Sequence, residues 1–261
     1  MAFDLSARAA LITGAGAPNG IGMATARLLG EMGARVYLTS VSPRSLERAA
    51  ELREQGIDAA ASTADLTDVT QVRDLARSVI EHFGALDILV NNAGMTSVTS
   101  PAEDAGEIGG LSEISETQFE QALHRNLTSA FSLTKSLLAE IRRSSAGRVV
   151  MVSSVTGGFM AMRSQVPYAA AKAGLLGLTR ALALDEADSG VTVNAVAPGW
   201  IATDSQTGHE RVQGLSTPMG RSGTAAEVAA AIAWLCTTEA SYITGQTLVV
   251  DGGNSIAEER S

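Results

Sequence analysis

The fold is decided near the amino terminus by residues 9–22, which read AALITGAGAPNGIG. The apolar run at residues 9–12 stops at a glycine-rich turn, and an Ala/Leu-rich helix is expected over residues 23–32. A strand, a glycine turn and a helix in this order favour a dinucleotide site, because glycines let the backbone approach a pyrophosphate. A tight connection without a ligand is the alternative. The glycines placed for such a site are Gly14, Gly16, Gly20 and Gly22.

The rest of the chain continues the alternation of short apolar runs and helical segments. Further strands are expected at residues 36–38, 59–64, 86–90, 148–152, 191–195 and 248–250. Further helices are expected over residues 44–55, 73–83, 119–142, 168 to about 185, and 225–235. Such alternation indicates a parallel sheet covered on both faces. The sequence therefore predicts a single doubly wound Rossmann-type α/β domain over residues 1–261, with ligands at the carboxyl ends of the strands.

Composition argues against several classes of partner and site. The net charge is −9 and Lys and Arg form no block, which argues against nucleic acid. Cys236 is the only cysteine and the 3 histidines are scattered, so neither an internal disulfide nor a metal site is expected. No stretch is long enough to span a bilayer, and no basic-then-apolar leader accompanies Asp4. These features predict a soluble, cytoplasmic protein that acts on a small molecule.

The sequence Tyr168-Ala-Ala-Ala-Lys172 points to carbonyl or alcohol chemistry. Residues four apart lie on one face of a helix, so the ammonium of Lys172 and the phenol of Tyr168 address one small volume. A free phenol has a pKa of about 10, and a nearby cation lowers that pKa so that the phenol transfers protons usefully. Ser154 precedes this pair in the run Val-Met-Val-Ser-Ser-Val. The alternative is that Tyr168 and Lys172 merely lie on a solvated helix face. Motifs elsewhere in the chain are needed to choose between the two interpretations.

Polar segments also follow the expected strands, where the ligand of such a sheet lies. Asn91-Asn92-Ala93-Gly94 follows the strand at residues 86–90, and a simple Asn/Gly turn is the alternative. Ser40 follows the second strand, at the position where an acidic residue would bind a ribose 2′-hydroxyl and repel a 2′-phosphate.

The residues around Ser40 bear on the choice between NADP(H) and NAD(H). Hydroxyls at Ser40 and Ser42 with Arg44 nearby favour a phosphate, and therefore NADP(H) over NAD(H). The arguments for NAD(H) are Asn19 in the glycine turn, the apolar side chain of Val41, and the alternative that the Arg44 side chain is simply solvated.

Taken together and in order, these motifs resemble the short-chain dehydrogenase/reductase family over nearly the whole chain. The closest likeness is to its 3-oxoacyl-acyl-carrier-protein reductase-like members. The resemblance implies hydride transfer between a nicotinamide and a carbonyl or secondary alcohol. It is carried by residues 13–22, 91–94, Asn126, Ser154, Tyr168, Lys172, residues 194–199 and residues 250–253.

The resemblance implies four residues that carry the chemistry. Tyr168 would exchange a proton with the substrate oxygen, while Lys172 holds the nicotinamide ribose and lowers the pKa of Tyr168. Ser154 would orient the substrate oxygen, with Ser153 as the neighbouring alternative. Asn126 would anchor a water that links Lys172 to solvent.

The resemblance also implies the cofactor contacts. Asp65 and Leu66 would flank the adenine, although Asp65 has a cap of the next helix as an alternative role. Pro198, Gly199 and Ile201 would contact the nicotinamide amide, with Thr203 at the pyrophosphate or the amide. The remaining cofactor residues are Gly14, Gly16, Asn19, Gly20, Ile21, Gly22, Ser40, Ser42, Arg44, Asn92, Ala93, Gly94, Tyr168 and Lys172.

Two features depart from the family pattern. Five residues separate Gly14 from Gly20, more than the family usually has. The segment 96–117 is also unusually long, and we expect it to cover the substrate mouth.

Residues 204–219 correspond to the family's variable substrate lid. Family members usually assemble as homotetramers, through the Asn126 helix, the Tyr168 helix and the last strand.

Three functions therefore compete. An NADPH-dependent reductase of a ketone or a 3-oxoacyl thioester is the leading hypothesis. An NAD-dependent dehydrogenase of a polyol, sugar, steroid or cyclic alcohol is the second. The third is a nucleotide-binding regulator without turnover, and the intact Ser154, Tyr168 and Lys172 argue against it. The acidic chain has only Lys135 and Lys172 as lysines, which counts against a substrate delivered by an acidic carrier protein.

Overall fold

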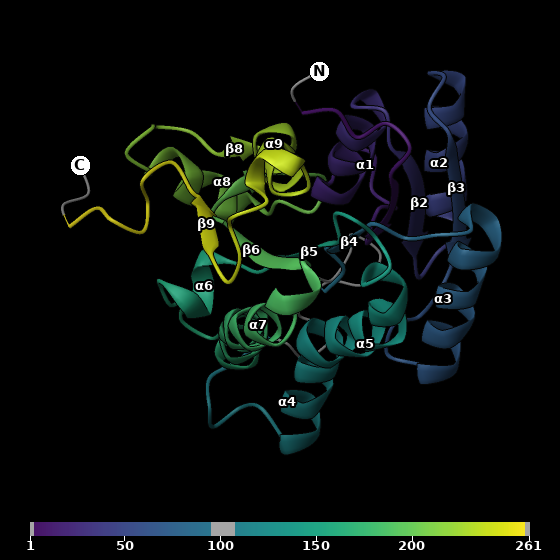
Figure 1. The fold of residues 1–261 in the computed structure, drawn as a ribbon. Coiled ribbons are helices and arrows are strands. Elements are labelled where there is room, and N and C mark those ends of the chain that lie inside the picture. Colours follow the sequence, from purple (N-terminus) through teal and green to yellow (C-terminus); the bar gives the residue numbers. More distant parts are fainter. Residues whose placement is uncertain (1–2, 95–107, 259–261) are drawn as a thin grey trace.

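A parallel sheet forms the centre of the computed structural model, which describes residues 3–94 and 108–258. Within these ranges the main sheet has seven strands, in the order β3-β2-β1-β4-β5-β6-β9 (Figure 1). The order reverses between β1 and β4, which confirms the predicted Rossmann-type α/β fold and marks the expected ligand position. The strands are β1 Ala9–Thr13, β2 Arg35–Ser40, β3 Ala59–Thr63, β4 Ile88–Asn91, β5 Arg148–Val152, β6 Thr192–Pro198 and β9 Thr247–Val250. A small second sheet pairs β7 Ile201–Ala202 with β8 Gly223–Thr224.

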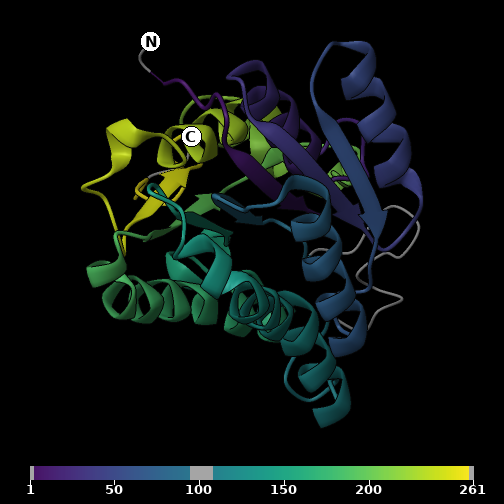
Figure 2. The ribbon, with the colours of Figure 1, turned by 45° about the vertical axis from the view of Figure 1, so that its right-hand side comes forward.

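Helices cover both faces of the main sheet (Figures 1 and 2). One face carries α1 Ile21–Glu31, α2 Arg44–Glu54 and α9 Ala225–Leu235. The other carries α3 Val69–Phe83, α5 Ser129–Ile141 and α7 Val166–Asp185. Shorter helices are α4 Glu116–Leu123, α6 Val155–Gly158 and α8 Gly208–Leu215. None of the described helices is long and apolar enough to cross a membrane.

Each face of the sheet has its own apolar core. Alternate residues of β1 enter different cores, with Ala10 and Ile12 on the α1 side and Ala9 and Leu11 on the α3 side. Both faces are therefore buried, which explains why the strands appear in the sequence as continuous apolar runs.

The helix expected over residues 73–83 begins earlier, at Val69. Asp68 caps it, because its carboxylate accepts hydrogen bonds from the backbone N–H groups of Thr70 (2.7 Å) and Gln71 (3.4 Å). The suggestion that Asp65 caps this helix is therefore wrong. The Asp65 carboxylate instead accepts hydrogen bonds from the N–H (2.9 Å) and hydroxyl (2.7 Å) of Thr67.

The helix expected over residues 119–142 is divided by a π-helical turn, η1 His124–Thr128, between α4 and α5. A capping box between Ser115 and Gln118 starts α4 at Glu116. The segment 96–117 lies largely outside the described residues. At its described end, the N–H of Gly109 donates to the carbonyl of Ser164, just before α7 (2.8 Å).

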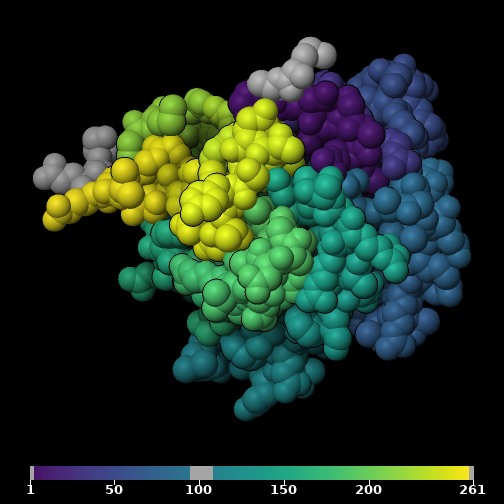
Figure 3. Space-filling view, in the orientation of Figure 1, coloured from purple at the N-terminus to yellow at the C-terminus, as the bar shows by residue number. Residues whose placement is uncertain are grey.

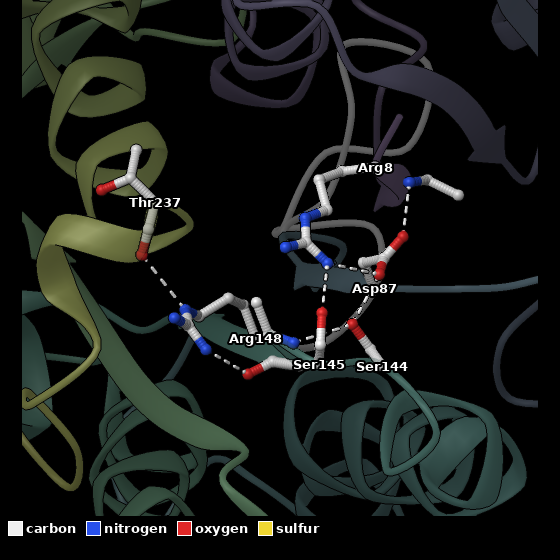
Figure 4. Close-up of polar contacts among 9 residues, drawn as sticks. Arg8, Asp87, Ser144, Ser145, Arg148 and Thr237 are labelled. Atoms are coloured by element: carbon white, nitrogen blue, oxygen red, sulfur yellow. Dashed lines mark hydrogen bonds and ion pairs between the residues drawn. The ribbon is translucent and has the colours of Figure 1, made fainter. Parts of the chain in front are cut away.

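A polar cluster fastens the amino ends of β1, β4 and β5 (Figure 4). Asp87 immediately precedes β4, and its carboxylate accepts hydrogen bonds from Arg8 Nη1 (3.1 Å), the Ala9 N–H (2.8 Å) and the Ser144 hydroxyl. Arg148 begins β5 and is 2% exposed. It donates from Nε to the Thr237 carbonyl (3.2 Å) and from Nη1 to the adjacent Gly147 carbonyl (2.9 Å). Burial lowers the pKa of the Arg148 guanidinium from its ordinary value.

Candidate active site

The glycine turn lies between β1 and α1 and fits a dinucleotide diphosphate. A side chain at Gly14, whose φ is 67°, would lie 2.9 Å from the Cα of Ala93, and one at Gly22 would lie 2.7 Å from the Gly14 carbonyl oxygen. Gly20 is the N-cap residue of α1 and brings no side chain to its first amides, and the first turn contains no acidic residue. The positive end of α1, which starts at Ile21, is thus open to an anion.

Asn92 fastens this turn to the end of β4. Its Nδ2 donates to the carbonyls of Thr13 (2.8 Å) and Gly14 (3.2 Å). The Thr13 hydroxyl oxygen accepts from the backbone N–H groups of Asn92 and Ala93, each at 2.9 Å. Asn92 therefore shapes the proposed cofactor site through the backbone. Thr13 was missing from the predicted site, although its hydroxyl directly before the first glycine was a usable signal.

The three residues expected to choose between NADP(H) and NAD(H) gather beside the same turn. A side chain at Gly16 would lie 2.9 Å from Ser40 Oγ and 3.4 Å from Arg44 Cβ. Ser40 Oγ donates to the carbonyl of Ser42 (2.8 Å), and Arg44 Nε donates to Ser42 Oγ (3.0 Å). The end of β2 thus presents hydroxyls and one guanidinium, with no carboxylate at Ser40.

Helix α7 presents Tyr168 and Lys172 together. Lys172 is 2% exposed, and its Nζ lies 5.6 Å from the centre of the Tyr168 ring. The same Nζ donates to the carbonyl of Val152 at the end of β5 (3.0 Å), which fixes the ammonium. A half-buried phenol therefore lies beside a buried cation.

Ser154 lies where β5 turns into α6, and its Oγ accepts a hydrogen bond from the N–H of Thr156 (3.1 Å). A side chain at Gly157, whose φ is 100°, would lie 2.2 Å from the Ala169 carbonyl oxygen, so this turn packs directly on α7 next to Tyr168. Ser153 is buried and donates to the Lys172 carbonyl (2.8 Å). Ser154 is therefore the serine that stays partly exposed beside α7.

Asn126 lies in the π-helical turn and is 1% exposed. Its Nδ2 donates to the carbonyl of Ala122 (3.1 Å). A side chain at Gly94 would lie 3.2 Å from Asn126 Oδ1, so the turn meets the end of β4. The π-helical turn is a feature that the sequence did not predict, and such turns are frequent at functional sites.

The remaining predicted residues lie at other carboxyl ends of the sheet. Pro198 ends β6, and the N–H of Gly199 donates to the Val250 carbonyl (3.0 Å). Ile201 lies in β7, and the hydroxyl of Thr203 is 3.1 Å from that of Ser205. Asp65 and Leu66 follow β3, on the far side of β2. No three His, Cys, Asp or Glu among the described residues gather in a way that could hold a metal ion.

Comparison with known proteins places this arrangement in a family. A family model described as enoyl-(acyl carrier protein) reductase matches residues 14–255. The 3-oxoacyl-acyl-carrier-protein reductase FabG of Vibrio cholerae serotype O1 is 37% identical over 254 residues, which cover 96% of this chain and 98% of that protein. The chain belongs to the short-chain dehydrogenase/reductase family. It is an oxidoreductase that acts on carbonyl or alcohol groups with a nicotinamide cofactor.

Solved structures of this family have the same fold. A variant of actinorhodin polyketide ketoreductase, solved with NADPH, has a TM-score of 0.85 and 33% identity, covering 96% of this chain and 98% of that one. A dehydrogenase/reductase from Sinorhizobium meliloti 1021 has a TM-score of 0.88 and 30% identity, covering 98% and 97%. This short-chain dehydrogenase/reductase is thus related to FabG and to polyketide ketoreductases.

Proposed function

We propose that this short-chain dehydrogenase/reductase is an NADPH-dependent reductase of a ketone or a 3-oxoacyl thioester. The observation that carries the cofactor choice is the cluster of Ser40, Ser42 and Arg44 against Gly16. A guanidinium with neighbouring hydroxyls suits a 2′-phosphate, whereas a carboxylate at Ser40 would repel it. Similarity to FabG and to a ketoreductase solved with NADPH supports reduction of a 3-oxo group.

The proposed chemistry divides among four side chains. A bound nicotinamide supplies the hydride to the carbonyl carbon. The Tyr168 hydroxyl donates its proton to the carbonyl oxygen, and the Lys172 ammonium, 5.6 Å from the ring centre, stabilises the phenolate that remains. Ser154 Oγ donates a hydrogen bond to the same oxygen and holds it in place. By the resemblance, the Asn126 carboxamide would anchor a water that links Lys172 to solvent, and the proton would return through that water.

A second candidate is an NAD-dependent dehydrogenase of a polyol, sugar, steroid or cyclic alcohol. The observation that favours it is the charge of the chain, which is −9 with only Lys135 and Lys172 as lysines. An acidic carrier protein docks best on a basic surface. A free ketone or alcohol has no such requirement.

The proposal includes a homotetramer. Large apolar side chains are exposed at the end of α7 and in the carboxyl-terminal segment, which lie side by side on one face (Figure 3). A side chain at Gly245 would touch the Cβ of Ala183 in α7 at 3.5 Å, so the two segments form one surface. The exposed residues of this surface are Leu184, Tyr242 and Leu248. Exposed apolar surface of this kind marks an interface between subunits.

The proposal also places the enzyme in a reducing setting, the cytoplasm. Cys236 is the only cysteine, and it is buried. Burial raises the pKa of its thiol to about 12, so the thiol stays protonated and unreactive.

The test compares NADPH and NADH as reductants of an acetoacetyl thioester. We expect a higher kcat/KM with NADPH than with NADH. Arg44→Ala should weaken NADPH binding by about tenfold, the effect of one charge-assisted hydrogen bond, and should leave NADH binding unchanged. Arg48→Ala in the same helix is the matched control, because Arg48 pairs with Glu51 (2.5 Å) instead. Equal loss for both cofactors in Arg44→Ala would contradict the NADP assignment. Turnover of polyols or cyclic alcohols with NAD and none of the thioester would establish the second candidate.

A further inference from the structure

The extra residues of the glycine turn form a turn of their own. The N–H of Gly20 donates to the carbonyl of Ala17 (3.1 Å), and Pro18 and Asn19 are exposed at the tip. Proline suits the second position of a β-turn, because its φ is already fixed near the required value. The insertion therefore projects from the loop, and Gly14 and Gly16 face Asn92 and Ser40.

The tip of this turn is bonded to the start of the lid. Asp204 Oδ1 accepts a hydrogen bond from Asn19 Nδ2 (2.8 Å), and Asp204 Oδ2 accepts one from the backbone N–H of Asn19 (3.2 Å). Both carboxylate oxygens thus bind one residue, which fixes their orientation. Asp204 directly follows Thr203 and opens the lid segment 204–219, which contains α8.

We propose that Asn19 and Asp204 form a latch that holds the lid against the glycine turn and slows release of the nicotinamide cofactor. The latch joins two segments that carry proposed cofactor contacts, residues 14–22 and 198–203. The latch proposal rests on the proposed function, in which these two segments bind the nicotinamide cofactor. Asn19 and Asp204 act here as positioning residues. Both are exposed, so the latch is weak enough to open in each catalytic cycle.

The release rate of NADPH tests the latch. We would load the full-length protein with NADPH, displace it with excess NADP⁺ and follow the loss of bound-NADPH fluorescence by stopped flow. Asp204→Ala removes both bonds and should release NADPH about three to ten times faster, the range for one ordinary hydrogen bond, because solvent weakens these exposed contacts. Asn19→Ala, which keeps the backbone bond, should lie between Asp204→Ala and the unmodified protein.

Two further variants separate the latch from a general effect of charge. The double variant Asn19→Ala/Asp204→Ala should release NADPH no faster than Asp204→Ala, because the bonds are already lost. Asp185→Asn removes one exposed carboxylate at the end of α7 and should release NADPH at the unmodified rate.

Hydrogen exchange in the cofactor-free protein is the second readout. Peptides covering residues 204–219 should exchange faster in Asp204→Ala and should be unchanged in Asp185→Asn. An unchanged release rate in Asp204→Ala would overturn the latch. Slower release with tighter binding would also overturn it, because the carboxylate would then compete with the cofactor for the end of α1. If the unmodified protein bound neither NADPH nor NADH, the proposed function would fail together with the latch.

Discussion

The two ends of the parallel sheet use polar groups in opposite ways. At the amino end, both oxygens of the Asp87 carboxylate accept hydrogen bonds, from Arg8, the Ala9 N–H and Ser144 (Figure 4). At the carboxyl end, several buried polar atoms have no hydrogen-bond partner in the part of the chain that the structure describes. They are Thr39 Oγ1, Asn91 Oδ1, Trp200 Nε1 and Asn254 Oδ1. Thr192 Oγ1, near the amino end of β6, is an exception.

This difference teaches which end is built for stability and which for binding. A buried polar atom without a partner costs about 1–3 kcal/mol, so such atoms are rare unless a ligand or solvent meets them. The carboxyl end also presents the open first turn of α1 and the fixed Lys172 ammonium. We infer that a residue at the amino end sets stability, whereas a residue at the carboxyl end sets turnover.

Tyr168→Phe is the strongest test of the carboxyl end. It removes one hydroxyl and keeps the ring that lies beside Lys172, so folding should be unchanged and cofactor binding largely intact. Loss of a general acid lowers kcat by about 100-fold to 10,000-fold. Steady-state turnover and NADPH fluorescence titration measure the two effects separately.

Tyr242→Phe is the matched control for this experiment. Tyr242 lies outside the site, on the surface proposed to join subunits, and Tyr242→Phe removes the same hydroxyl while keeping the apolar ring. It should leave kcat unchanged. Retained turnover in Tyr168→Phe would show that the proton comes from another group.

Asp87→Ala tests the amino end. It leaves the guanidinium of Arg8 without its anionic partner and the N–H of Ala9 without an acceptor, so unfolding should become easier by about 2–4 kcal/mol, the cost of breaking a largely buried charged network. Urea unfolding measures this loss. At a temperature where the variant is folded, kcat/KM should equal that of the unmodified protein.

A surface carboxylate gives the control for Asp87. Asp74 pairs with Arg77 on the exposed side of α3, and Asp74→Ala should change the free energy of unfolding little, since surface pairs contribute at most about 1 kcal/mol. A fall in kcat of Asp87→Ala as large as that of Tyr168→Phe would break the division between the two ends.

The sequence was sufficient for features that depend on neighbouring residues. The glycine turn, the spacing of Tyr168 and Lys172 and the alternation of elements are local patterns, and the α/β fold that they predicted is confirmed. The start of α3 was missed because a capping aspartate, Asp68, looks like any loop aspartate until its bonds are known.

Contacts between distant residues could not be predicted. The bonds from Arg148 to Thr237 and from Asn19 to Asp204 join residues 89 and 185 positions apart, and only the folded chain brings them together. The π-helical turn at Asn126 has no local signal either, because it forms where α4 and the turn itself pack against α7.

The smallest expected effect on stability concerns Glu227, a hydrogen-bonded carboxylate on the carboxyl side of the sheet. Hydrogen bonds from Arg221 and then from the Thr224 N–H lower the pKa of Glu227 from 4.5 to about 2. A carboxyl whose pKa is lowered on folding stabilises the protein above pH 4.5, and that stabilisation is lost as the pH falls through about 2.

Arg221→Gln should therefore raise the pKa of Glu227, as followed by carbon-detected NMR, and destabilise the protein slightly near neutral pH but not near pH 2. The effect on stability should be far below that of Asp87→Ala, because the pair is exposed and solvent and salt weaken it. If Arg221→Gln destabilised the protein as much as Asp87→Ala, hydrogen bonding alone would decide stability, and the burial that distinguishes the Asp87 cluster would not matter.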